Sequence, residues 1–187
     1  MRPNEIAYEV VYRRIKHPRI ELKTGKIVVI LPEGHDPEQV LQKHGKWIRD
    51  KLDIISKALS RIKGKTLANR SSNDLREIVE RFTRSYENEL GVNVNRIFIR
   101  RMKTKWASCS PRKNLTINEL ARHLPEQLIG YIIYHELTHI IEKRHNEKFW
   151  KIVSKKYPNY SNLEKQLLTY WFLIMKTNFN DKNSDQK

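Results

Sequence analysis

Residues 131–150, YIIYHELTHIIEKRHNEKFW, constrain this chain more than any other stretch. They contain an H-E-x-x-H pattern that runs from His135 through Glu136 to His139. Because residues four apart lie one turn above each other on the same face of a helix, the two imidazoles can converge on one metal ion. Glu136 is rotated about 100° from His135 on such a helix, so it can reach a metal-bound water without being a ligand.

The residues around this pattern indicate a buried helix. Counted at 100° per residue, the apolar side chains spread round most of the circumference. They are Leu128, Ile129, Ile132, Ile133, Leu137, Ile140 and Ile141. A buried polar group without a partner costs about 1–3 kcal/mol, so the histidines must either bond to core neighbours or bind a metal. The spacing favours metal binding.

A third ligand is needed, and two residues compete for this role. On an unbroken helix His145 would lie about 9 Å along the axis from His139, too far to share a metal with bonds of about 2.0–2.1 Å. The helix must therefore end first, and Asn146, followed by Glu147 and an apolar run, predicts the N-cap of a new helix. Glu142 lies on the same face as the two histidines and is the alternative ligand, or a partner that orients a histidine. We favour His145.

Charge and cysteine content limit the setting in which the chain works. Its 187 residues include 37 Lys and Arg against 21 Asp and Glu, a net charge of +16. Such a balance favours polyanions, so nucleic-acid contact through a basic surface is one predicted interaction, although a basic proteome or selection for solubility produces the same charge. The single Cys109 excludes an internal disulfide and a cysteine-based zinc site, and we expect a cytoplasmic protein. No run of 18 apolar residues is present, so we expect no membrane span.

The remaining pattern predicts an α+β protein with three parts. Residues 1–60 are expected to form an N-terminal lobe, with a small antiparallel sheet over residues 5–31 and a helix that starts at Asp36. Residues 73–175 are expected to form the catalytic domain, and the polar residues 176–187 a disordered tail. The expected elements of the catalytic domain are a helix at 75–90, strands at 92–102, 106–110 and 115–118, the histidine helix after Pro125, and helices after Asn146 and from Ser161 to about Met175.

The strand at 115–118 directly precedes the histidine helix and is a candidate edge of its sheet. An edge strand binds an extended peptide by adding it to the sheet. The sequence therefore predicts a protein or peptide substrate.

Several of these motifs together resemble the YgjP-like metallopeptidase family, which is related more distantly to the SprT-like and WLM proteases. The resemblance covers residues from about 5 to about 175. It rests on Trp106-Ala-Ser-Cys-Ser110, Leu115-Thr-Ile-Asn118, Pro125, the stretch from Tyr131 to His139, and His145-Asn-Glu-Lys-Phe-Trp150. It implies a minimal zincin-like metallopeptidase core with an N-terminal β-rich lobe, with zinc on His135, His139 and His145. It also favours His145 over Glu142 and implies Glu136 as the general base.

These observations predict a zinc metallopeptidase-like hydrolase, in which Glu136 acts as general base on a zinc-bound water. A further donor is usually needed to stabilise the oxyanion. Tyr157, Tyr160 and Arg144 are the candidates.

Two other functions remain alternatives. The resemblance also implies a metal-dependent nucleotide pyrophosphohydrolase acting on substrates such as UTP, in which Arg100, Arg101, Lys103 and Lys105 would hold phosphates. The second alternative is a basic nucleic-acid-binding module with a structural metal. It is disfavoured because a structural zinc site normally has four protein ligands and only three are convincing here.

Overall fold

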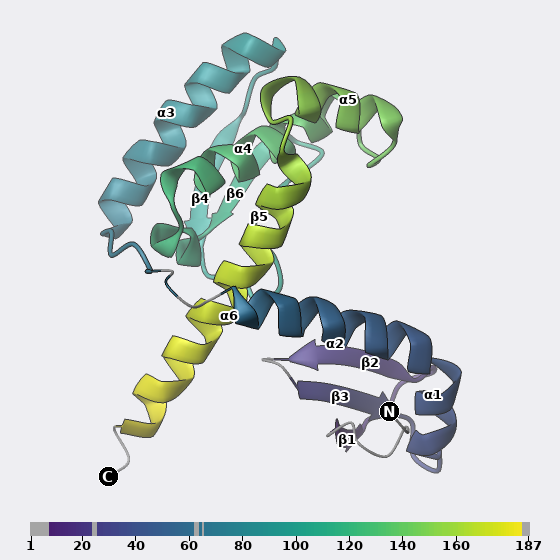
Figure 1. Cartoon of the computed structure of the whole chain (residues 1–187). Helices are drawn as coiled ribbons and strands as arrows, with labels where there is room; N and C mark the ends of the chain where they lie inside the picture. Colours follow the sequence, from purple (N-terminus) through teal and green to yellow (C-terminus); the bar gives the residue numbers. More distant parts are fainter. Residues whose placement is uncertain (1–7, 24–25, 62–63, 65, 185–187) are drawn as a thin grey trace. The chain divides into compact units, whose positions relative to one another are not determined.

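The computed structural model describes residues 8–23, 26–61, 64 and 66–184. They divide into two compact units, one made of residues 1–64 with 171–187 and the other of residues 65–170 (Figure 1). Each unit combines helices with a three-stranded sheet, which confirms the α+β class. The sequence also predicted an N-terminal lobe, a catalytic domain and a disordered tail. Whether these parts fold independently or lack order is a separate property, so their boundaries stay predictions. Residues 1–7 and 185–187 lie outside the described residues.

The first unit contains a mixed sheet, where an antiparallel one was predicted. Its elements are β1 (Tyr8–Tyr12), β2 (Arg19–Lys23), β3 (Lys26–Leu31), α1 (Pro37–Lys43) and α2 (Gly45–Ser60). β3 lies in the middle, parallel to β1 and antiparallel to β2. Residues 28–31 are a continuous buried apolar run, which is typical of a central strand covered on both faces.

The start of α1 follows its sequence signals. The side chain of Asp36 accepts a hydrogen bond from the main-chain N–H of Glu38 and caps the helix. Val29 and Leu31 of β3 pack with Ile48 of α2 in the core of this unit. The sheet and its two helices therefore share one small core.

The second unit carries the H-E-x-x-H helix. Its elements are α3 (Ser72–Leu90), β4 (Arg96–Arg100), β5 (Ala107–Cys109), β6 (Asn114–Asn118), the 3₁₀ helix η2 (Glu119–His123), α4 (Glu126–Ile141), α5 (Glu147–Lys156) and the first part of α6 (Tyr160–Ser184). A capping box between Ser71 and Asp74 starts α3, and Gly91, in a left-handed conformation with φ 64°, ends it. Helices α3 and α4 pack together beside the sheet (Figure 1).

The strand order in this sheet is β4-β6-β5, so the predicted edge is wrong. β6 lies in the middle, parallel to β4 and antiparallel to β5, and its Leu115 and Ile117 are fully buried. β5 takes the edge instead, because residues 101–106 carry the chain across the sheet. The buried side chain of Asn118 holds this crossing: its amide donates to the carbonyls of Met102 (2.9 Å) and Lys105 (2.7 Å).

The C-terminal helices begin close to the predicted positions. α5 starts directly after Asn146, as predicted, whereas α6 starts at Tyr160 and continues beyond Met175 to Ser184. None of the helices in the described part of the chain has the length and apolar character that a bilayer span requires.

Candidate metal centre

Helix α4 is buried along most of its length, as its apolar circumference predicted. Leu128, Ile129, Ile133 and Leu137 are at most 1% exposed. The helix ends at Ile141, and the next residue has an extended backbone. This ending frees the chain to turn before α5, as the hypothesis of a third ligand beyond the helix requires.

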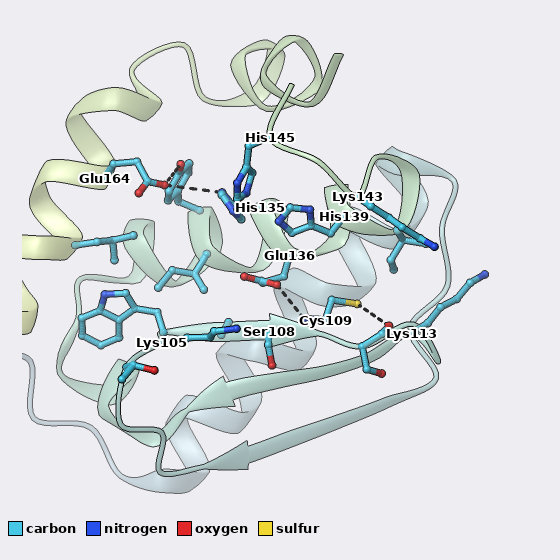
Figure 2. A pocket seen from close by; sticks show the side chains of 18 of the residues that line it. Lys105, Ser108, Cys109, Lys113, His135, Glu136, His139, Lys143, His145 and Glu164 are labelled. Atoms are coloured by element: carbon cyan, nitrogen blue, oxygen red, sulfur yellow. Dashed lines mark hydrogen bonds and ion pairs between the residues drawn. The ribbon is translucent and has the colours of Figure 1, made fainter. Parts of the chain in front are cut away.

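Three histidine side chains meet at this turn (Figure 2). His135 and His139 come from successive turns of α4, and His145 comes from the connection to α5. One potential ligand atom from each lies within 4.8 Å of the others, and Nε2 of His135 is 3.0 Å from Nε2 of His145. In a tetrahedral site with zinc–nitrogen bonds of about 2.0–2.1 Å, the nitrogens lie about 3.4 Å apart, so the cluster fits such an ion. The assignment of His135, His139 and His145 as metal ligands stays a prediction.

The main chain of Glu142 orients His139. Its carbonyl oxygen lies 3.2 Å from Nδ1 of His139. Since a carbonyl can only accept, Nδ1 carries the proton and Nε2 is left to face the cluster. The Glu142 carboxylate instead accepts a hydrogen bond from the main-chain N–H of Arg144 at 3.2 Å. The side chain suggested as an alternative ligand is thus engaged with the turn, and its own carbonyl positions a histidine.

A carboxylate that sequence reasoning missed faces His135. Oε1 of Glu164, on α6, lies 3.8 Å from Nδ1 of His135 (Figure 2). Tyr131 donates its hydroxyl hydrogen to the same oxygen. Nδ1 of His135 is buried and has no hydrogen-bond partner among the described residues. Glu164 is exposed on α6, and its place three residues before the buried Leu167 was the only sequence signal for it.

Two aromatic residues of α5, Phe149 and Trp150, pack against the imidazoles. The ring centroid of the fully buried Phe149 lies 4.9 Å from that of His135, 4.6 Å from that of His139 and 4.7 Å from that of His145. The indole of Trp150 stacks on His145 with ring centroids 5.6 Å apart. These contacts leave the rings little freedom, because the aromatic residues belong to a capped helix.

Burial favours the uncharged form of the two helical histidines. The pKa of His135 is lowered to about 3, mainly by burial and in addition by the neighbouring His139 and His145. Burial also lowers the pKa of His139. Neutral imidazole is the form that binds metal, so the electrostatics agree with the donor geometry.

Glu136 lies between the histidine cluster and the edge strand β5 (Figure 2). Its Oε2 accepts a hydrogen bond from the main-chain N–H of Cys109 at 2.9 Å. Burial raises the pKa of Glu136 to about 7, against the opposing effects of the Cys109 hydrogen bond and the positive charge of Lys105. The carboxylate is therefore fixed in direction and partly desolvated beside the candidate metal position.

Some main-chain N–H and C=O groups of β5 do not form hydrogen bonds with β6. Asn118 donates to the carbonyl of Trp106 (2.7 Å) and Ser110 donates to that of Asn114 (3.0 Å). Because hydrogen-bonded pairs alternate along an antiparallel ladder, the N–H and C=O of residues 107 and 109 point to the opposite edge. The hydrogen bond from Cys109 to Glu136 shows that this edge faces the histidine helix.

A pocket of about 680 Å³ opens over these groups, and all its lining residues belong to the second unit. The lining includes residues 104–111 and the side chains of His135, Glu136, His139 and His145. Of the four basic residues suggested to hold phosphates, Lys105 alone lines it. The suggested oxyanion donors Tyr157, Tyr160 and Arg144 do not line it, and the Tyr157 hydroxyl is 2.6 Å from that of Tyr86.

Comparison with known proteins places the second unit in a family. The family model described as "YgjP-like, metallopeptidase domain" matches residues 60–170. The crystal structure of the metallopeptidase zymogen of Pyrococcus abyssi abylysin is similar, with 27% identity, 49% of this chain and 92% of that chain covered, and a TM-score of 0.45. The metallopeptidase zymogen of Methanocaldococcus jannaschii jannalysin has 28% identity, 56% and 96% coverage, and a TM-score of 0.42. No curated protein matches the chain.

Proposed function

Because the chain belongs to the YgjP-like metallopeptidase domain family, we propose that it is a zinc-dependent peptidase. His135, His139 and His145 hold the metal. Zinc is the ion that suits this donor set best, because three neutral imidazoles with one open position are a common zinc arrangement in hydrolases. When bound, zinc supplies a Lewis acid and lowers the pKa of water, which generates a nucleophile at neutral pH.

The observation that carries the proposal is the position of Glu136. Its carboxylate lies beside the three histidines, and the N–H of Cys109 holds it in place. Glu136 takes the proton of the attacking water and then delivers it to the leaving amine. Phe149, which is fully buried beneath the imidazoles, excludes water from the protein side of the site.

The edge of β5 supports a peptide as the substrate. The N–H and C=O of Ala107 point away from β6 and into the pocket region, where an extended peptide can pair with them. Such pairing would place a peptide bond alongside Glu136. We therefore still propose that the peptide adds to an edge strand, but this strand is β5 and not the strand at 115–118.

The two alternative functions have less support than the peptidase. Of the four basic residues suggested to hold phosphates, Lys105 alone lines the pocket. Lys113 and Lys143 line it as well, so a nucleoside triphosphate is tested beside casein. A nucleic-acid-binding role through the basic surface stays a prediction that rests on the net charge of +16. The cytoplasmic location also stays a prediction.

The test compares metal content and hydrolysis in matched variants. Wild-type protein and Glu136→Gln, both loaded with zinc, are incubated with casein and with a nucleoside triphosphate. We expect casein cleavage that Glu136→Gln reduces by at least a hundredfold, with the bound zinc unchanged. Cleavage that persists in Glu136→Gln, or hydrolysis of the triphosphate alone, would contradict the proposal.

A second pair of variants tests the ligand set. His145→Ala should lose most of its bound zinc, because two imidazoles remain. Glu142→Ala should keep its zinc, because the main-chain carbonyl that orients His139 is retained. Equal zinc content in the two variants would contradict this assignment.

A further inference from the structure

Three lysines surround the pocket at both ends of the edge strand. Lys105 precedes β5, Lys113 lies in the turn between β5 and β6, and Lys143 follows α4, and all three are exposed and line the pocket. Figure 2 shows Lys105 on one side of Glu136 and the other two lysines on the opposite side. The positive groups therefore flank the reaction centre along the direction of β5.

None of these lysines forms an ion pair with a carboxylate in the part of the chain that the structure describes. The positive charge of Lys105 acts on Glu136 only by lowering the pKa of that carboxyl. The two carboxylates that line the pocket have other partners, since Glu136 accepts from Cys109 and Glu164 accepts from Tyr131. A divalent cation on the histidines would add further positive charge, so an anionic ligand is favoured at this site.

We propose that this site selects peptides with acidic side chains on both sides of the bond that is cleaved. This inference rests on the peptidase function proposed above and specifies its substrate class. The chain from residue 105 to residue 110 spans about 16 Å at about 3.3 Å per residue, which matches roughly five residues of an extended peptide. A peptide paired with β5 thus places side chains two or three positions from the cleaved bond near Lys105 at one end and near Lys113 and Lys143 at the other.

The experiment uses three fluorescence-quenched peptides with the same apolar centre. They differ only at the third position on each side of that centre, which is Glu, Gln or Lys. The zinc-loaded full chain should show kcat/KM values in the order Glu, Gln, Lys, with about two- to fivefold between Glu and Gln for each lysine engaged. The differences should shrink between 50 mM and 500 mM NaCl, because salt screens exposed charges.

Charge reversal provides the matched variant. In Lys113→Glu/Lys143→Glu the advantage of the Glu peptide over the Lys peptide should be lost, because two of the three lysines become acidic and Lys105 alone remains. Residue 113 has φ 57°, and glutamate is strained there as lysine is, so the turn is not altered by a change in backbone preference. Lys151→Glu, at an exposed position of α5 outside the pocket lining, should keep the wild-type order.

A binding measurement separates this inference from the peptidase function. Zinc-loaded Glu136→Gln is titrated with each peptide, and Kd is measured by fluorescence anisotropy. Binding in the order Glu, Gln, Lys without cleavage by wild type supports the acidic preference and overturns the peptidase function. Equal cleavage of all three peptides, equal Kd values, or binding of UTP with no binding of any peptide overturns the acidic preference.

Discussion

Oε1 of Glu164 lies 3.8 Å from Nδ1 of His135, across the gap between α6 and α4. A histidine that binds metal through Nε2 needs an acceptor for its Nδ1–H, which fixes the ring and raises its basicity. Nδ1 of His135 is buried, and no other described residue provides that acceptor. The contact is longer than a hydrogen bond, and a small rotation of the ring on metal binding would close it. We therefore expect Glu164→Ala to weaken zinc binding by about 10- to 100-fold.

The measurement is a zinc titration against a competing chelator. Lys165→Ala is the matched control, because Lys165 is an exposed neighbour on α6 that does not line the pocket. Glu164→Gln keeps an acceptor oxygen and should recover part of the affinity. An unchanged zinc affinity in Glu164→Ala would show that the ring of His135 is held by its packing alone.

Removing the aromatic ring of Phe149 should affect both the stability of the fold and the binding of metal. Phe149 is fully buried and contacts all three imidazoles, so Phe149→Ala should lower the free energy of unfolding by about 3–5 kcal/mol. Phe149→Leu keeps most of the volume and should cost less. Urea denaturation of the metal-free protein measures this loss. Zinc affinity should fall in the same order, and a stable Phe149→Ala protein with full zinc affinity would contradict this role.

The sequence predicted the parts of this site that depend on local rules. The spacing of His135 and His139 follows from the period of a helix, and the ending before His145 follows from the cap at Asn146. Strand order was not predictable in this way, because the pairing of β6 with β4 joins residues that are distant along the chain and leaves no local signal. Glu164 was missed for the same reason, since only the docking of α6 brings it to His135.

The cap at Asn146 should carry a measurable share of the stability of α5. Its Oδ1 accepts a hydrogen bond from the N–H of Phe149 at 3.0 Å. Asn146→Ala leaves that N–H without its partner and should cost about 1 kcal/mol in urea denaturation. Asn146→Asp keeps the acceptor and adds a favourable charge at the helix N-terminus, but it loses the hydrogen bond of the Asn146 side chain to Glu142, so it should recover only part of the loss. An equal loss of unfolding free energy in both variants would show that the hydrogen bond of the cap does not cause it.

The edge strand can be probed through its thiol, because Cys109 is the single cysteine in the sequence. The pKa of Cys109 is raised to about 11, mainly by burial and in addition by the negative charge of Glu136. The thiolate is the reactive form, so at pH 8 about one thiol in a thousand is ionised, against about a quarter for a free cysteine of pKa ~8.5.

Iodoacetamide should therefore alkylate the folded protein slowly at pH 8. The rate should rise about tenfold for each unit of pH towards 10, and the reaction should be rapid in urea. Glu136→Gln removes the carboxylate charge, lowers the pKa of the thiol and should speed the reaction, as followed by intact mass. A rate at pH 8 equal to that of the unfolded chain would mean that β5 does not stay packed against α4.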